Sequence, residues 1–87
     1  MTTARLLQMH IGAAARYQGR PLHEALVDKC RELGLSGASV FHGLEGTVVL
    51  TVDSEERIAA AAPQLESMLE TGTIAIEDVR VRRIRRG

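Results

Sequence analysis

The feature that most constrains this chain is the order in which its hydrophobic patterns change along 87 residues. Residues 4–12 alternate apolar and polar side chains, which is typical of a strand with one buried face. Residues 21–33 repeat apolar side chains at helical spacing, and Pro21 fits the first helical turn, where a missing N–H costs nothing. We predict a strand, a loop over 13–20 and a helix that ends at Gly34, a residue suited to the left-handed C-terminal cap.

The second half of the chain predicts a hairpin, a helix and a last strand. Residues 38–43 and 47–52 are short strand patterns on either side of a tight turn, so they predict an antiparallel pair. A second amphipathic helix begins after them, and we expect Asp53 to be its N-cap with Glu56 as its capping-box partner. The last strand is expected over residues 73–84.

Pro63 interrupts the apolar stripe of the second helix. A proline inside a helix removes one backbone hydrogen bond and clashes with the preceding turn, which costs about 3 kcal/mol unless the context relieves it. We therefore expect either one kinked helix or two shorter helices before Gly72, which ends the element.

The order β-α-β-β-α-β defines the expected fold as a single α+β domain over residues 1–87. Right-handed crossovers place both helices on one face of a four-stranded antiparallel sheet, as in a ferredoxin-like sandwich. The other face carries Gln8 and His10 together with apolar side chains and is bare in a monomer. A chain of this length buries only about 60–65% of its unfolded surface, so we expect other copies of the chain to cover that face.

The composition argues against several classes of protein. The chain has one Phe, one Tyr, no Trp and a formal net charge of +0, so it offers neither a base-stacking platform nor the basic excess of a nucleic-acid-binding protein. No apolar run approaches the roughly 20 residues of a membrane span, and no signal-peptide pattern is visible, so we expect a cytoplasmic protein without membrane insertion. Cys30 lies in the apolar stripe of the first helix and is expected to be a buried thiol.

The sequence gives little support for a metal site or a catalytic site. His10, His23 and His42 lack the paired spacing of a zinc site, and we expect them to be structural. The carboxylates accompany no nucleophile or base in a recognisable catalytic set. We therefore expect a protein that is not an enzyme and has no metal site.

Three motifs distributed over nearly the whole chain carry a resemblance to a known family. They are Tyr17-x-Gly19-x-Pro21-Leu22, Leu33-Gly34-Leu35-x-Gly37-Ala38-x-Val40 and Gly43-x-x-Gly46. With these motifs the chain resembles the short bacterial PII-like proteins, a domain of unknown function related to the nitrogen-regulatory PII signalling proteins. The resemblance implies a homotrimer that binds a small anionic effector between subunits and modulates a partner protein. It suggests an adenine nucleotide as the effector and a membrane transporter as one kind of partner.

The resemblance also implies six residues for a nucleotide or anion site. They are Ser39 on the second strand, Gly43 and Gly46 at the base of the following loop, Gly72 after the second helix, and Arg80 and Arg82 on the last strand. Alternate strand residues face the same side, so two guanidinium groups can meet one phosphate there. The residues alone leave a plainer alternative, in which the five arginines between 80 and 86 belong to a solvated edge strand and tail.

The chain departs from the family pattern after Gly43-x-x-Gly46. Family members carry a glycine-rich stretch and a long loop at this place, whereas here Gly46 is followed directly by Thr47 and a strand pattern. The missing loop weakens any site that uses the loop base. It favours an alternative function, a non-catalytic structural or assembly module that has no small-molecule ligand and presents the hairpin 43–46 as a docking surface.

Overall fold

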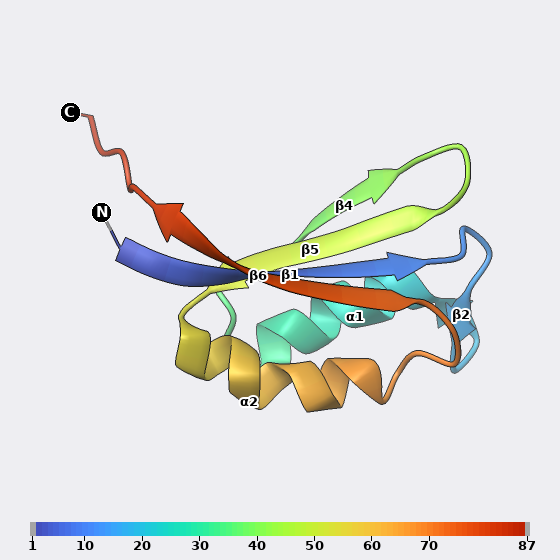
Figure 1. The fold of residues 1–87 in the computed structure, drawn as a ribbon. Coiled ribbons are helices and arrows are strands. Elements are labelled where there is room, and N and C mark those ends of the chain that lie inside the picture. Colours follow the sequence, from blue (N-terminus) through green and yellow to red (C-terminus); the bar gives the residue numbers. More distant parts are fainter. Residues whose placement is uncertain (1, 87) are drawn as a thin grey trace.

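The computed structural model describes residues 2–86 and shows one four-stranded sheet and two helices (Figure 1). The elements are β1 (Thr2–Ile11), β2 (Arg16–Tyr17), β3 (Arg20–Pro21), α1 (Leu22–Glu32), β4 (Ser39–His42), β5 (Thr47–Asp53), α2 (Glu55–Glu66) and β6 (Thr73–Val81). The sheet order is β4-β5-β1-β6, and every neighbouring pair is antiparallel. The ferredoxin-like β-α-β-β-α-β fold expected from the sequence is confirmed.

Both helices lie on the same side of the sheet, and the core lies between these two layers (Figure 1). Leu7, Met9 and Ile11 alternate along β1 toward the helices and are at most 5% exposed. Their neighbours on β5 and on the helices complete the buried cluster, which includes Val49, Leu26, Cys30, Ile58 and Leu65. The expectation that Cys30 is a buried thiol is confirmed.

The other side of the sheet is the open face, and in one chain no helix covers it (Figure 1). Antiparallel partners share a face, so the register places its side chains in rows across the strands. The rows comprise Ser39 and Phe41 of β4, Val48, Leu50 and Val52 of β5, Leu6, Gln8 and His10 of β1, and Ala75, Glu77 and Val79 of β6. Phe41, the single phenylalanine of the chain, is 57% exposed there.

The segment expected to be a loop contains a small hairpin of β2 and β3. Gln18 and Gly19 form its tip with φ angles of 48° and 82°, the positive values that tight two-residue hairpins require. Pro21 pairs with Arg16 in this hairpin and immediately precedes α1, so its expected place in the first helical turn is wrong by one residue. Strands of two residues are too short to show an alternating pattern, which explains why the sequence did not indicate them.

The start of α2 also differs from the expectation by one residue. Its N-cap is Ser54, whose Oγ accepts the backbone N–H of Arg57 at 3.2 Å, and not Asp53. Asp53 ends β5 and accepts the N–H groups of Ser36 and Ser54 at 2.8 and 2.7 Å. Both residue types favour N-caps, and the long-range bond to Ser36 decides which of the two takes the cap.

Pro63 does not divide the second helix, because α2 is one element from Glu55 to Glu66. The carbonyl that Pro63 leaves without a helical donor belongs to Ala59, an exposed residue, so water can reach it. The last strand ends at Val81 and not at residue 84, since Val81 with Thr2 is its last pair on β1. Among residues 2–86, neither helix has the length and hydropathy needed to cross a membrane.

Candidate functional site

Two glycines expected at the site lie together at one end of the sheet, which we call the loop end. A Cβ atom on Gly46 would come within 2.8 Å of the Ile11 carbonyl oxygen, and one on Gly72 within 2.7 Å of the His10 carbonyl oxygen. The β4–β5 turn and the loop before β6 therefore lie in close contact with the last residues of β1. Gly72 also has a φ of 140°, a backbone conformation that other residues rarely adopt.

The turn between β4 and β5 is tight and closed. The N–H of Gly43 donates to the carbonyl oxygen of Gly46 at 2.7 Å, which leaves Leu44 and Glu45 as the tip. Leu44 is fully exposed. Ser39 lies further back on β4, where it is exposed on the open face opposite Leu50. The loop end thus presents a short hairpin, in place of the long loop that the resemblance implied.

The electrostatics of the loop end do not favour an anion. A cleft of about 340 Å³ adjoins Gly72, and its lining consists of Glu66, Leu69, Glu70, Thr71, Gly72 and Ile74. Two of these side chains are carboxylates and none is basic. An anionic ligand at Gly72 therefore needs positive charge from another part of the molecule or from another chain.

The opposite end of the sheet, which we call the basic end, carries that charge. A larger cleft of about 560 Å³ lies there, lined by Thr2, Thr3, Ala4, Ser36, Val52, Asp53, Ser54, Val81, Arg82 and Arg83. Ser54 is the N-cap of α2, so the partly positive end of that helix contributes to the same cleft. Two guanidinium groups and a helix N-terminus together attract phosphate-like anions.

The arginine arrangement differs in detail from the one that the resemblance implies. Arg80 lies opposite Thr3 on the last part of β6, whereas Arg82 follows the end of the strand. The lining of the basic-end cleft contains Arg82 and Arg83 but not Arg80. Sequence reasoning did not single out Arg83, although it belongs to the same arginine cluster, nor did it indicate Ser36. The joint contact of Arg80 and Arg82 with one anion stays a prediction.

Asp53 is the acidic member of the basic-end cleft, and its carboxylate is held within the protein. Burial alone would raise the pKa of this carboxyl, but the N–H donors of Ser54 and Ser36 and the nearby Arg57 guanidinium outweigh burial and lower it. The side chain is 11% exposed. Because its charge is satisfied by these donors, Asp53 shapes the cleft wall more than it repels an incoming anion.

The loop end and the basic end are too far apart in one chain to hold one small ligand. Gly72 adjoins His10 at one end of β1, and Arg80 lies opposite Thr3 near the other end. Thr3 and His10 are seven positions apart along the strand, which corresponds to about 23 Å. The glycines and arginines expected at one site therefore meet only if two chains contribute.

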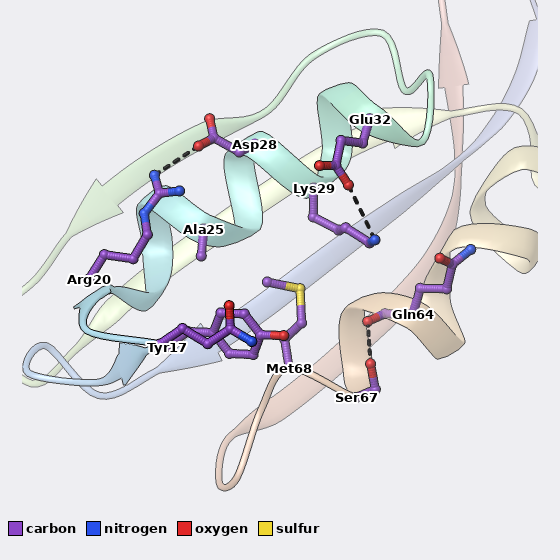
Figure 2. A pocket seen from close by; sticks show the side chains of 10 residues that line it. Tyr17, Arg20, Ala25, Asp28, Lys29, Glu32, Gln64, Ser67 and Met68 are labelled. Atoms are coloured by element: carbon purple, nitrogen blue, oxygen red, sulfur yellow. Dashed lines mark hydrogen bonds and ion pairs between the residues drawn. The ribbon is translucent and has the colours of Figure 1, made fainter.

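A third hollow lies between the two helices and is closed at one end by the β2–β3 hairpin (Figure 2). It measures about 340 Å³, and its charged side chains pair with one another. Arg20 bonds Asp28 at 2.8 Å and Lys29 bonds Glu32 at 3.2 Å, and both bonds are drawn in Figure 2. None of the six expected site residues lines this groove within residues 2–86, and its two basic side chains, Arg20 and Lys29, are already paired with carboxylates.

Comparison with known proteins identifies the family to which the chain belongs. Its sequence matches the family described as "Uncharacterized ACR, COG1993" (DUF190) over residues 4–49 and 47–81. The chain belongs to this family. The family is PII-like, so the resemblance read from the motifs is confirmed. A curated relative is the UPF0166 protein of Aquifex aeolicus (strain VF5), which is 26% identical over 97 aligned positions that cover 88% of this chain and 91% of the relative.

The family match divides close to the β4–β5 turn. The match to the DUF190 family is made in two segments that meet at residues 47–49, immediately after the hairpin tip. The alignment with the relative has 97 positions, more than the 87 residues of this chain, so the relative carries residues that this chain lacks. The family match thus divides at the start of β5, directly after the closed turn.

Proposed function

We propose that this chain is a regulatory protein of the cytoplasm that forms a homotrimer and binds a small anionic effector between its subunits. The observation that carries the proposal is the division of the expected site between the two ends of β1. A neighbouring copy can bring its basic end against the loop end of the first chain. One ligand then contacts Gly46 and Gly72 from one subunit and the arginines from the next.

The open face supports assembly. Its central row joins Leu50 of β5 to Gln8 of β1 and Ala75 of β6, and the rows beside it carry Val48, Leu6 and further apolar side chains. Burying apolar surface yields about 25 cal/mol per Å², so contact with other copies stabilises a domain too small to have a large core. The helices already cover the opposite side of the sheet and leave this face as the assembly surface.

An adenine nucleotide is the effector that best fits these features. The basic-end cleft, at about 560 Å³, lies within the range of small-molecule pockets, and its two arginines suit phosphate oxygens. Glycines at the loop end let the two loops lie close against β1, which leaves a small, uncrowded surface for the ligand. The carboxylates near Gly72 repel phosphate, so we assign most of the attraction to the arginines.

The lining of the basic-end cleft favours binding over catalysis. The Ser36 hydroxyl donates to the Val52 carbonyl oxygen at 2.8 Å, and the Ser54 hydroxyl accepts the N–H of Arg57. Asp53, the carboxylate in this lining, accepts the N–H groups of Ser36 and Ser54 and has a lowered pKa, which makes it a weak base for activating a serine nucleophile. We therefore propose an effector whose binding alters contact with a partner protein, a membrane transporter being one candidate, and no reaction of the effector.

The oligomeric state is tested by measuring the native mass with light scattering after size-exclusion chromatography. We expect a particle of three chains for the wild type and monomers for Leu50→Lys, which places a charge at the centre of the open face. Leu44→Lys is the matched control, because the hairpin tip is already fully exposed, and it should leave the mass unchanged. A wild-type monomer at micromolar concentration would overturn the trimer.

Effector binding is tested by calorimetry with ATP and ADP. We expect saturable binding to the wild type and at least about tenfold weaker binding to the double variant Arg80→Ala and Arg82→Ala, since charge-assisted bonds to phosphate are lost. Arg31→Ala removes an exposed guanidinium from α1 and serves as the control. If the wild-type assembly binds neither nucleotide, the effector proposal fails for nucleotides and the structural module with an exposed hairpin tip gains support.

A further inference from the structure

Two histidines that are distant in sequence come into contact at the edge of the sheet. His23 lies in the first turn of α1, and His42 is the last residue of β4. Their ring centroids are 5.0 Å apart, and the ring planes are nearly perpendicular at 84°. His42 is exposed and His23 is half-buried, so an ion in solution can reach the pair.

The spacing of the two rings matches chelation of one metal ion. A metal–nitrogen bond of about 2.0–2.1 Å places a ring centroid about 3.2 Å from the ion. Two rings at a tetrahedral angle then have centroids about 5.2 Å apart, and two rings at a right angle about 4.5 Å. The observed separation of 5.0 Å lies between these values.

His42 also has the outer contact that metal-binding histidines commonly have. Its Nδ1 lies 3.2 Å from Oγ1 of Thr47, the residue opposite it in the β4–β5 register. Thr47 is 2% exposed and therefore holds a fixed position. When Nδ1 carries the proton it donates to Thr47, and Nε2 has its lone pair available for a metal ion.

We propose that His23 and His42 bind one divalent transition-metal ion of the Cu²⁺, Ni²⁺ and Zn²⁺ group through their imidazole nitrogens. Within residues 2–86 no third histidine, cysteine, aspartate or glutamate joins them in a metal-binding group, so water completes the coordination. A site with two protein ligands exchanges its ion readily. Cu²⁺ should bind more tightly than Ni²⁺ or Zn²⁺, following the general order of affinity of nitrogen ligands.

The test is calorimetric titration of the tag-free full chain with NiCl₂ and ZnCl₂, with MgCl₂ as the ion that imidazole does not favour. We expect one Ni²⁺ or Zn²⁺ per chain, and at least about tenfold weaker binding in His23→Gln and in His42→Gln, because each retains a single imidazole. His10→Gln is the matched control, since His10 is an exposed histidine on the open face that contacts Gln8. Circular dichroism establishes that each variant is folded.

A spectroscopic measurement separates chelation from mere ring contact, because edge-to-face packing of two aromatic rings also occurs at this distance. The electron paramagnetic resonance spectrum of bound Cu²⁺ should show splitting from two nitrogens, and His42→Gln should reduce this to one. Thr47→Val should weaken Ni²⁺ binding by about tenfold while both histidines remain. The site is overturned if the wild type shows no saturable binding of these ions, or if His10→Gln loses as much affinity as His42→Gln.

Discussion

Replacing Asp53 with alanine tests how the end of β5 is joined to the start of α2. The two carboxylate oxygens accept the N–H of Ser36 at 2.8 Å and the N–H of Ser54 at 2.7 Å, and the side chain is 11% exposed. Alanine removes both acceptors. It leaves two backbone donors that must turn to water or remain without a partner.

The size of the effect follows from these two bonds. A hydrogen bond to a charged group contributes about 1.5–3 kcal/mol, and the exposed surroundings of Ser36 and Ser54 favour the lower part of this range, so losing both bonds in Asp53→Ala should cost about 3–4 kcal/mol. Asp53→Asn retains one side-chain oxygen and should cost about half as much. Native domains of this size are stable by only about 4–13 kcal/mol, so the alanine variant should be clearly weakened.

The assay is urea-induced unfolding followed by circular dichroism at one fixed protein concentration, because the proposed assembly would make stability depend on concentration. Glu45→Ala, at the exposed hairpin tip, is the control and should stay within about 0.5 kcal/mol of the wild type. The reasoning is refuted if Asp53→Ala also stays within that margin. If Asp53→Asn and Asp53→Ala lower the unfolding free energy equally, the single oxygen acceptor that asparagine retains contributes nothing to stability.

The Asp53 carboxyl also predicts that stability depends on acid, because its pKa is lower in the folded protein than in the unfolded chain. Its contribution to the unfolding free energy is fully present above the unfolded pKa of about 3.9 and is lost as the pH falls through the folded pKa. Urea titrations from pH 6 down to about pH 2 should show a smaller loss in Asp53→Ala than in the wild type, and equal losses would contradict it. Gly72→Ala should lower the unfolding free energy by about 1–3 kcal/mol, because its φ is 140° and the new Cβ would lie 2.7 Å from the His10 carbonyl oxygen. Gly12→Ala, which has open space around it, is the comparison in thermal melts, and equal effects would argue against the close approach. Burial raises the pKa of the Cys30 thiol, so an aromatic disulfide reagent should label it at least about tenfold more slowly in the native protein than in urea, and rapid native labelling would contradict this.

The order of elements could be predicted from the sequence because each main element carries its own pattern. The patterns over residues 21–33 and 73–84 predicted α1 and β6, with the start of β6 exact and the other ends within three residues of the structure. The β2–β3 hairpin was missed because two-residue strands show no alternation, and the glycine after Gln18 was its only local signal. The predicted N-cap of α2 was wrong by one residue because Ser36, which is distant in sequence, bonds Asp53 and leaves the cap to Ser54.

The six expected site residues came from family resemblance, and the residues alone would not have grouped them. Where β6 ends depends on its register with β1, so the sequence could not show that Arg82 and Arg83, but not Arg80, share a cleft with Ser54. The contact of His23 with His42 likewise depends on how α1 packs beside β4, which no spacing along the chain reveals. Local sequence patterns predict single helices and strands. A site formed by two elements can be located only when the packing of those elements is known.

The closed β4–β5 turn limits how the proposed effector could act on this protein. The 2.7 Å bond between the Gly43 N–H and the Gly46 carbonyl oxygen leaves no long segment there to become ordered on binding. The segment after β6 differs, since residues 82–86 have no regular structure and begin in the basic-end cleft. A ligand shifts a protein only toward the state in which it makes more favourable contacts, so bound nucleotide should order this segment.

Hydrogen exchange of backbone amides with and without ATP tests that consequence. We expect slower exchange at residues 82–86 when ATP is bound, because phosphate contacts hold the arginine side chains and restrict the backbone that carries them. Exchange at the hairpin 43–46 should change little, since that turn is already closed by its own hydrogen bond. Protection gained at the hairpin alone would place the effector's influence in the turn and would contradict the assignment of the response to the arginine segment.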